Sequence, residues 1–425
     1  MIQLWVAQGL FPFSNREAEV EAAKMFASLS SRQFIVPSPR HFNYEANPSK
    51  IRFPYDTTHE YTTVLDSGQP DMMDDVPQTS VKHLCIDNKS SRQLNFNSAS
   101  LKRFPQLQTL LFLSAAPSLP LERLLRDAFF SLTHLESLIL RTSHISELPL
   151  SVLNLKSLRY LDLSYTCIRE LPQAILTKLR HLVLDIIKQL QYIPPGIGNL
   201  TALQTMSAFI VGNNNNGCQI VELKNMTNLT GELWIVSMEN VSHWEEARDA
   251  NLKSKEFLRS LSLRWSIVAA LSNDDATKRQ EQILEYLQPP LGIEELRILS
   301  YGGLKLPSWI AHPSYQHLTL IALRCCLNCC ESLTPFGKLP RLKCLCISGM
   351  HQLQRIDNKQ LCGRDGDDMP TFPCLKELSL YEMPALQEWV GAQKGDFPCL
   401  EKLEVGLCPN WFHSQCFHTS IPLRN

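Results

Sequence analysis

The chain has 425 residues, of which 44% are hydrophobic and 20% are charged, so it can bury a large core and is not a mostly disordered protein. Its 41 basic and 42 acidic residues give a net charge of −1, which provides no field to attract nucleic acid or an anionic membrane. The N-terminus lacks the pattern of a secretory signal and no apolar run is long enough to span a bilayer, so the sequence predicts a cytoplasmic protein without a nucleic-acid partner.

Residues 1–64 differ in pattern from the rest of the chain. Apolar residues have a helical spacing at Val20, Met25 and Leu29, and no strand repeat is visible there. The stretch 65–80 is acidic and contains two prolines, which indicates a linker. The sequence therefore predicts a small, incomplete helical domain followed by a linker.

From residue 81 onward the pattern Leu-x-x-Leu-x-Leu recurs, which is the signature of leucine-rich repeats. Eleven clear copies begin at Val81, Leu107, Leu135, Leu158, Leu179, Leu258, Ile293, Leu318, Leu342, Leu375 and Leu400, and two weaker ones begin at Leu203 and Leu229. One repeat cannot bury its own leucines, so neighbouring repeats must stack to complete the core. The predicted fold is an α/β leucine-rich-repeat solenoid, a horseshoe of about thirteen repeats over residues 81–425.

Two segments depart from the repeat pattern. Asp274 to Leu287 has a capping aspartate at its start, apolar residues on one face and a Pro-Pro pair at 289–290, which predicts a helix. Asn213 to Asn216 is a polar tract, which predicts a loose surface loop. Both are expected on the convex side, where repeat lengths vary.

The expected binding surface is the concave side, because side chains alternate along a strand and those between the leucines face away from the core. Basic side chains gather in the early repeats, where they suit an acidic partner, and aromatic residues follow several later strands. The candidate protein-binding residues are Arg141, Arg159, Tyr160, Arg180, His181, Trp265, Tyr301 and Tyr381. The competing interpretations are that the charges are ordinary solvated surface and that the aromatic rings pack against the next repeat.

A cysteine cluster at 325–330 has a spacing that is also found in zinc sites. However, Cys326 occupies the ninth position of its repeat, where such repeats use Asn or Cys to bond the backbone across the turn, and Cys408 occupies the same position. We therefore expect no metal site. No nucleophile with a partnered histidine is recognisable, and the chain is not expected to be an enzyme.

Several unlinked segments resemble plant intracellular immune receptors of the nucleotide-binding, leucine-rich-repeat class (NB-ARC/LRR disease-resistance proteins). Met1 to Gly9 resembles a Leu-Trp-x-Ala-x-Gly segment in the winged helix of their nucleotide-binding module, and Lys24 to Phe34 resembles the helix that follows. Glu222 to Val241 and Leu306 to Trp309 resemble signatures of the family's repeat array. The resemblance implies that residues 1–64 are a partial winged-helix segment of the switch module.

The resemblance is incomplete at the nucleotide site. A Met-His-Asp triplet contacts nucleotide in the family, and the loosely aligned segment here is Pro54-Tyr55-Asp56, in which only Asp56 matches. No Gly-x-x-x-x-Gly-Lys-Ser/Thr phosphate loop occurs in the chain. We therefore expect no cofactor here, with ATP or ADP bound only by a full-length form, and the resemblance implies a truncated receptor.

The resemblance implies a protein-recognition module that acts in plant defence. The implied partners are a pathogen effector or a modified host protein, together with the nucleotide-binding module of a receptor. The alternative is the ectodomain of an extracellular leucine-rich-repeat receptor, which is favoured by glycosylation sequons at Asn88, Asn199, Asn225, Asn228 and Asn240. The absence of signal and membrane-spanning patterns opposes this alternative.

Overall fold

The computed structural model describes residues 62–66, 81–87, 98–114, 121–141, 143–172, 176–184, 190–213, 216–267, 274–329, 333–363, 371–391 and 395–411. The chain divides into two compact units, residues 1–189 and 190–425. Almost all of the predicted winged-helix segment, including Pro54-Tyr55-Asp56, lies outside the described residues.

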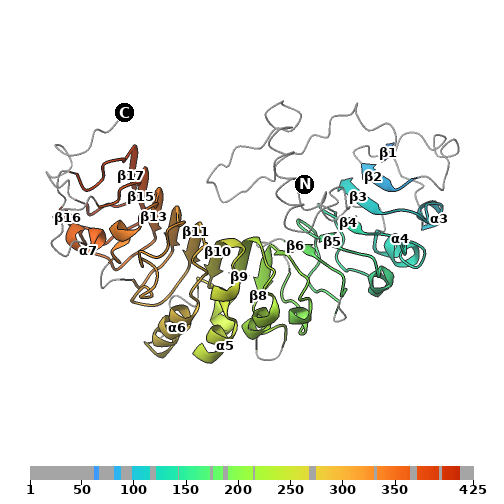
Figure 1. Ribbon diagram of the computed structural model, residues 1–425, viewed down its shortest axis with the longest axis horizontal. Helices are drawn as coiled ribbons and strands as arrows, with labels where there is room; N and C mark the ends of the chain where they lie inside the picture. The colour runs from blue at the N-terminus through green and yellow to red at the C-terminus, as the bar shows by residue number, and fades with distance from the viewer. Residues whose placement is uncertain are drawn as a thin grey trace. The chain divides into compact units, whose positions relative to one another are not determined.

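In the first unit, parallel strands follow one another in chain order (Figure 1). They are β1 (Thr62–Asp66), β2 (His83–Asp87), β3 (Thr109–Ser114), β4 (Ser137–Ile139), β5 (Tyr160–Asp162) and β6 (His181–Val183). The connections include α3 (Ser98–Lys102), α4 (Leu121–Ala128) and the 3-10 turn η2 (Leu150–Asn154). The leucines of the repeat pattern are buried between the strands and these connections, as Leu135, Leu138 and Leu140 show.

Strand β1 extends the sheet upstream of the predicted array. Thr62 pairs with His83 and Asp66 pairs with Asp87 in a parallel register, although we expected the repeats to begin at Val81. The segment Thr-Thr-Val-Leu-Asp lacks the spaced leucines of the repeat pattern, so it does not match the template. Its β-branched residues nevertheless favour an extended chain beside an open strand edge.

The second unit continues the same architecture. Its strands are β7 (Thr205–Met206), β8 (Ala208–Ile210), β9 (Gly231–Val236), β10 (Leu258–Arg264), β11 (Glu295–Leu299), β12 (Leu320–Arg324), β13 (Cys344–Ser348), β15 (Glu377–Tyr381) and β17 (Lys402–Gly406). From β8 to β17 they form one parallel sheet in chain order. Every predicted repeat start is thus followed by a strand, and the predicted α/β leucine-rich-repeat fold is confirmed.

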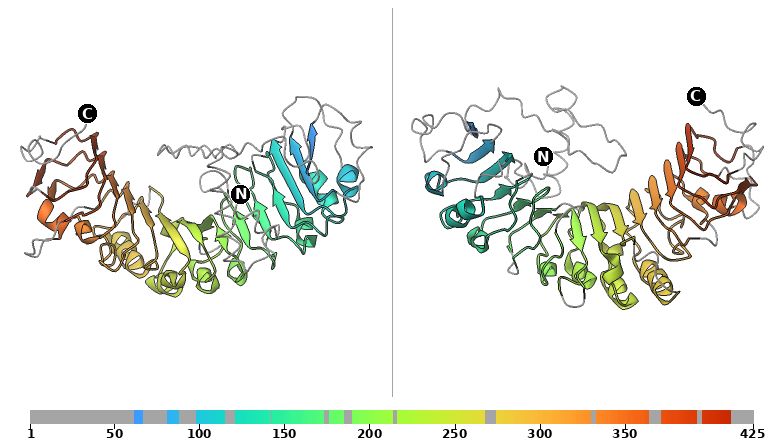
Figure 2. Two further views of the ribbon diagram at one scale, coloured as in Figure 1. Left: turned by 45° about the horizontal axis from the view of Figure 1, so that its top comes forward. Right: turned by 180° about the vertical axis from the view of Figure 1, so that it is seen from behind.

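Helices and turns cover the outer side of this second sheet, and the strands line its inner, concave side (Figure 2). The outer elements are η3 (Ile197–Asn199), η4 (Ile220–Asn225), η5 (Met238–Asn240), α5 (Trp244–Asp249), η6 (Leu252–Ser254), α6 (Asp274–Tyr286), η8 (Phe336–Lys338) and α7 (Asn358–Cys362). Near the last repeats, β14 (Arg355–Asp357) and β16 (Glu388–Val390) form a separate two-stranded parallel sheet. Side chains on the concave side are left open to a partner.

A left-handed residue ends many of the strands, two positions after the last inward-facing strand residue. It recurs at Ser237, Ser300, Cys325, Gly349, Glu382 and Leu407, and Tyr165 has the same conformation three residues after the end of β5. This conformation reverses the chain, and the next residue then points into the core, as the buried Met350 and Met383 do. The glycine is required at 349, because a Cβ there would lie 2.8 Å from the Cα of Cys325.

Helix α6 confirms the predicted helix of residues 274–287, and it also clamps the next repeat. Gln280 Oε1 accepts a hydrogen bond from the backbone N–H of Gly302 at 2.8 Å. Glu281 Oε1 accepts one from the N–H of Leu304, also at 2.8 Å. The helix thus satisfies backbone donors in the turn that follows β11, where no ladder partner is available.

The predicted loop at Asn213 to Asn216 is a tight turn at its base. The backbone N–H of Asn216 donates to the carbonyl of Asn213 at 3.1 Å and to its side-chain Oδ1 at 2.8 Å. This is the usual way in which asparagine closes a turn. Residues 214–215, at the tip, lie outside the described residues.

Candidate functional site

On the concave face of the second unit, paired residues of adjacent strands stand side by side and form three rows. The first row consists of Glu232, Ser260, Glu295, Leu320, Cys344, Glu377 and Lys402. The second row consists of Trp234, Ser262, Arg297, Ala322, Cys346, Ser379 and Glu404. The third row consists of Val236, Arg264, Leu299, Arg324, Ser348, Tyr381 and Gly406. The strand residues between the rows, such as Leu261 and Leu263, are buried in the core.

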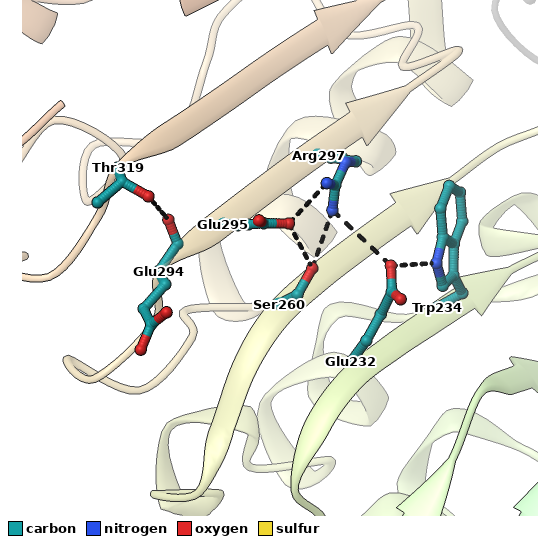
Figure 3. A network of polar contacts seen from close by, with 7 residues as sticks. All are labelled: Glu232, Trp234, Ser260, Glu294, Glu295, Arg297 and Thr319. Carbon is teal, nitrogen blue, oxygen red and sulfur yellow. Dashed lines mark hydrogen bonds and ion pairs between the residues drawn. The ribbon is translucent and has the colours of Figure 1, made fainter. Parts of the chain in front are cut away.

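Arg297 lies at the centre of a polar network on this face (Figure 3). Its Nη2 atom is 2.6 Å from Glu295 Oε2, and its Nη1 atom donates to Ser260 Oγ at 2.9 Å. Glu232, two strands away, brings Oε1 within 3.8 Å of the same Nη1. The guanidinium is held from two sides, and these contacts cross three repeats.

Glu232 also fixes the orientation of an aromatic ring. The indole Nε1 of Trp234 donates to Glu232 Oε1 at 2.8 Å, and Figure 3 shows both side chains beside Arg297. Trp234 is half-buried and Glu232 is exposed. An aromatic ring and an arginine in fixed positions lose little conformational entropy on binding, and these residue types often dominate binding energy at protein interfaces.

The third row combines basic, apolar and aromatic side chains. Arg264 and Arg324 lie on either side of Leu299, which is only 7% exposed. Tyr381, further along the row, is 49% exposed, and its ring lies against Gly406 of the next repeat. A Cβ at residue 406 would lie 2.3 Å from the ring, so glycine leaves the space that the ring occupies.

Exposed ion pairs occupy the last repeats. Lys376 Nζ lies 2.7 Å from Glu401 Oε1, and Lys402 Nζ lies 2.7 Å from Glu404 Oε1. The hydrogen bond from Lys402 lowers the pKa of Glu404. Pairs as exposed as these contribute little to stability, so they mainly set the charge pattern of this end of the face.

The cysteines of residues 325–346 serve different structural roles. Cys326 Sγ lies 3.8 Å from the carbonyl oxygen of Ile298 and 3.7 Å from that of Arg324, which confirms the predicted turn-bonding role of the ninth position. Cys344 lies in the first row instead, where burial and the nearby Glu377 raise its pKa to about 11. In the described part of the chain, no group of three or more His, Cys, Asp or Glu residues is arranged to hold a metal ion. Cys330 lies outside that part.

In the first unit, two predicted binding residues are buried. Tyr160 forms an apolar cluster with Ile139, and the His181 ring lies 5.9 Å from that of Tyr160. Burial lowers the pKa of His181 to about 4, with a smaller contribution from Arg180. Strand alternation correctly places these side chains on the face opposite the leucines, but their low exposure contradicts the expectation that they lie open to solvent.

The three predicted arginines do not form a single stripe. The N–H of Arg180 donates to the carbonyl of Arg159 at 2.8 Å, and the N–H of Arg159 donates to that of Glu136, so Arg159 and Arg180 are true neighbours. Arg141 follows β4, whereas Arg159 precedes β5, which places them at opposite ends of the strands. The Arg141 guanidinium lies 5.3 Å from the centre of the Tyr165 ring.

Two predicted aromatic anchors belong to the core. Trp265 is 1% exposed and Tyr301 is fully buried, and their rings meet edge to face at 5.3 Å. Tyr301 follows the left-handed Ser300, so it occupies the same inward position as Cys326. The packing interpretation is therefore correct for both residues. Tyr381 comes just before the left-handed residue of its repeat, Glu382, and its side chain faces outward, unlike the side chains of Trp265 and Tyr301.

The network residues Glu232, Glu295 and Arg297 were missed as a group. The linear sequence does not reveal these contacts, because Arg297 bonds to residues 37 and 65 positions earlier along the chain as well as to its near neighbour. Such pairs emerge only when the strand register is known. The signal that could have found them is the alignment of the variable positions of successive Leu-x-x-Leu-x-Leu segments, read across repeats.

No helix in the described part of the chain has the length and apolar character needed to cross a membrane. A family model described as R13L1/DRL21 LRRs matches residues 220–350, which include β9 to β13 and the Arg297 network. A putative disease resistance protein of Arabidopsis thaliana is 32% identical over 382 residues, covering 80% of this chain and 26% of that protein. The chain is a leucine-rich-repeat protein related to plant disease resistance proteins.

This leucine-rich-repeat chain is also similar to other curated proteins and to solved structures. The putative disease resistance protein RGA4 of Solanum bulbocastanum is 35% identical, over 54% of this chain and 22% of that protein. Among solved structures, the functional domain of InlJ from Listeria monocytogenes matches with 14% identity and a TM-score of 0.47, covering 78% of this chain and 59% of that one. The chain spans about a quarter of the length of the curated relatives that it matches.

Proposed function

We propose that this chain is the protein-recognition module of a plant immune receptor, and that the concave face of its second unit binds the recognised protein. The observation that carries the proposal is the Arg297 network, in which an arginine and Trp234 are held in fixed positions on an open face. The proposed ligand is a pathogen effector or a modified host protein. The resemblance to intracellular receptors also supports a cytoplasmic location and the nucleotide-binding module of a receptor as a second partner.

The side chains of this concave face suit protein binding. It presents arginine and aromatic side chains, which are enriched at protein interfaces, on a rigid sheet. Arg297 has donors beyond those that contact Glu295 and Ser260, so it can still contact a partner. Binding there would need little rearrangement of the chain.

Two sequons weigh against the extracellular alternative. The side-chain amide of Asn240 donates to the carbonyl of Val211 at 2.8 Å, and that of Asn228 donates to the carbonyl of Thr201 at 2.9 Å. A glycan on either nitrogen would compete with a contact between repeats. These two sequons are therefore poor acceptor sites in the folded chain.

The proposal is tested by a pairwise binding screen of the purified chain against secreted pathogen proteins and host defence proteins. Each binder is then tested against Arg297→Glu and Glu232→Arg, with Arg248→Glu on the outer helix α5 as a matched charge reversal. We expect the two concave-face variants to lose binding and the α5 variant to retain it. Partner proteins that still bind both concave-face variants, but no longer bind the Arg248→Glu variant, would overturn the proposal.

A further inference from the structure

The third row has a regular spacing that a partner can match. Adjacent strands of a sheet lie about 4.8 Å apart, so Arg264 and Arg324, with Leu299 between them, are separated by about 10 Å. Tyr381 lies two strands beyond Arg324 in the same row. A basic, apolar, basic and then aromatic order therefore runs across the strands from β10 to β15.

The charges of both arginines act on the Cys325 thiol, in the turn that follows β12. The pKa of the Cys325 thiol is raised by burial and by Glu382, and lowered by Arg324 and Arg264. Two acidic groups lie just beyond this edge, namely Glu382, which follows Tyr381, and Glu239, which accepts a hydrogen bond from the N–H of Ser266 at 2.9 Å. The third row itself contains no carboxylate from β9 to β17.

The carboxylates of the first row lie across the second row from this edge, and Arg324, which already interacts within the chain, keeps further N–H donors for a carboxylate. Glu295 and Glu232 contact Arg297. Glu377 is exposed at the other edge of the strands, across the second row from Tyr381. The charge of the third row therefore favours an acidic segment over a basic one.

We propose that the third row binds an acidic amphipathic α-helix of the partner protein, lying across strands β10 to β15. The inference rests on the proposed function. Acidic residues at positions i and i+7 of the helix would contact Arg264 and Arg324, an apolar residue at i+3 or i+4 would cover Leu299, and a second apolar residue at i+14 would meet Tyr381. Arginine is well suited to such contacts because its guanidinium binds a carboxylate through two parallel hydrogen bonds.

The geometry selects a helix over other peptide forms. A helix rises about 1.5 Å per residue, so i and i+7 are about 10.5 Å apart, close to the span of two strands. A polyproline helix also repeats at about 9.3 Å, but it presents no residue on the same side at half that distance to cover Leu299. In an extended strand, side chains on one face are about 6.8 Å apart, and this spacing does not match that of the two arginines.

The test uses a fluorescein-labelled 18-residue helical peptide with Glu at positions 2 and 9, Leu at positions 5 and 16, and neutral helix formers elsewhere. The controls are a peptide with Lys at positions 2 and 9, and a peptide of the same composition with the second Glu moved to position 7, on another face. Fluorescence anisotropy measures binding to the purified chain. We expect the first peptide to bind at least about tenfold more tightly than either control.

Variants of the chain locate the binding. Arg264→Glu and Arg324→Glu should each weaken binding of the first peptide by about tenfold or more. Arg259→Glu is the matched control, because Arg259 lies at the other edge of the strands, where its Nε atom is 3.6 Å from Glu294. Added salt should weaken the first peptide's binding. Equal binding of the three peptides, indifference to both arginine variants, or a Kd weaker than about 1 mM would overturn the inference.

Failure of this inference can be distinguished from failure of the proposed function. If the protein partners found in the screen require Arg297 and Glu232 but tolerate Arg264→Glu and Arg324→Glu, the proposed function stands and the helix site is wrong. If the partners tolerate all four changes, both are wrong. If the partners and the peptide both require the two arginines, both are supported.

Discussion

Arg297 and Glu295 are two residues apart on the same face of β11, and the Arg297 Nη2 atom lies 2.6 Å from Glu295 Oε2. Their side chains are only 23% and 25% exposed, so solvent screens this pair less than it screens the exposed pairs of the last repeats. The pair is also shared with Ser260 and Glu232, which belong to earlier repeats. It should therefore couple neighbouring repeats as well as shape the open face.

The first prediction is that this pair stabilises the array. Arg297→Met should lower the free energy of unfolding by about 2 kcal/mol, because the partly buried Glu295 carboxylate then lacks its cation. Glu295→Gln should cost about 1 kcal/mol, and the double variant should cost less than the sum of the two. Urea unfolding followed by circular dichroism measures all three. Lys376→Met at the exposed pair is the control and should produce no measurable change; an additive double variant would contradict the prediction.

The second prediction separates two tyrosines that look alike in the sequence. Tyr301→Ala should destabilise the chain by about 3–5 kcal/mol, because it removes a buried ring that contacts Trp265. Tyr301→Phe should lower the free energy of unfolding by about 1 kcal/mol. It removes only the hydrogen bond, 2.8 Å long, that the hydroxyl donates to the carbonyl of Lys305. Tyr381→Ala should change stability by about 1 kcal/mol or less.

Thermal and urea unfolding midpoints measure the predicted order of stabilities. The binding assays measure the predicted effect of Tyr381→Ala on partner binding. Tyr381→Ala should weaken partner binding without loss of folding. Equal midpoints for the two alanine variants would show that the inward and outward positions have been assigned wrongly.

The repeat pattern predicts the strands well because burial leaves little freedom at the leucine positions. Residues such as Leu261 and Leu263 must face the core, and this fixes which strand residues face outward. The same logic extends to the ninth position, where the Cys326 thiol approaches backbone carbonyls and Tyr301 is buried in the core. Tyr301 is the ninth residue of the repeat that begins at Ile293, so the same rule favours the packing interpretation for this ring.

Other features depend on contacts that no single repeat contains. The burial of Tyr160 depends on Ile139 in the previous repeat. Strand β1 pairs with β2 without carrying the leucine pattern, so periodicity could not reveal it.

The third prediction concerns a buried lysine between repeats. Lys255 is fully buried, and its Nζ donates to the carbonyl of Leu223 at 2.6 Å and to that of Met226 at 3.3 Å. Burial lowers its pKa from 10.5 to about 8. Between these two values the unfolded chain binds more protons than the folded chain, so this residue's contribution to stability rises as the pH rises from 8 to 10.5.

Comparison with Lys255→Met isolates this effect from other titrating groups. The variant loses both hydrogen bonds at every pH, which adds a constant difference in the free energy of unfolding. The wild-type chain should gain up to about 3 kcal/mol relative to the variant between pH 7 and pH 10.5. Urea midpoints at both pH values measure the change, and a difference that does not vary with pH would refute the prediction.

The last prediction concerns the paired arginines of the first unit and the proposed nucleotide-binding partner. Arg159 and Arg180 lie on neighbouring repeats, and burial and the charge of Arg159 lower the pKa of Arg180, with Glu136 acting in the opposite direction. Two adjacent guanidinium groups suit one acidic surface.

We predict that the nucleotide-binding module of a disease resistance relative, supplied in trans, binds the chain with an affinity that falls as salt rises. Arg159→Glu combined with Arg180→Glu should reduce this affinity by at least about tenfold. Arg141→Glu is the matched control and should leave the affinity unchanged, because Arg141 lies at the opposite end of the strands over Tyr165. Titration calorimetry at two salt concentrations makes the measurement. If the paired reversal and Arg141→Glu have equal effects, the two arginines are ordinary surface charges, and this module docks elsewhere or not at all.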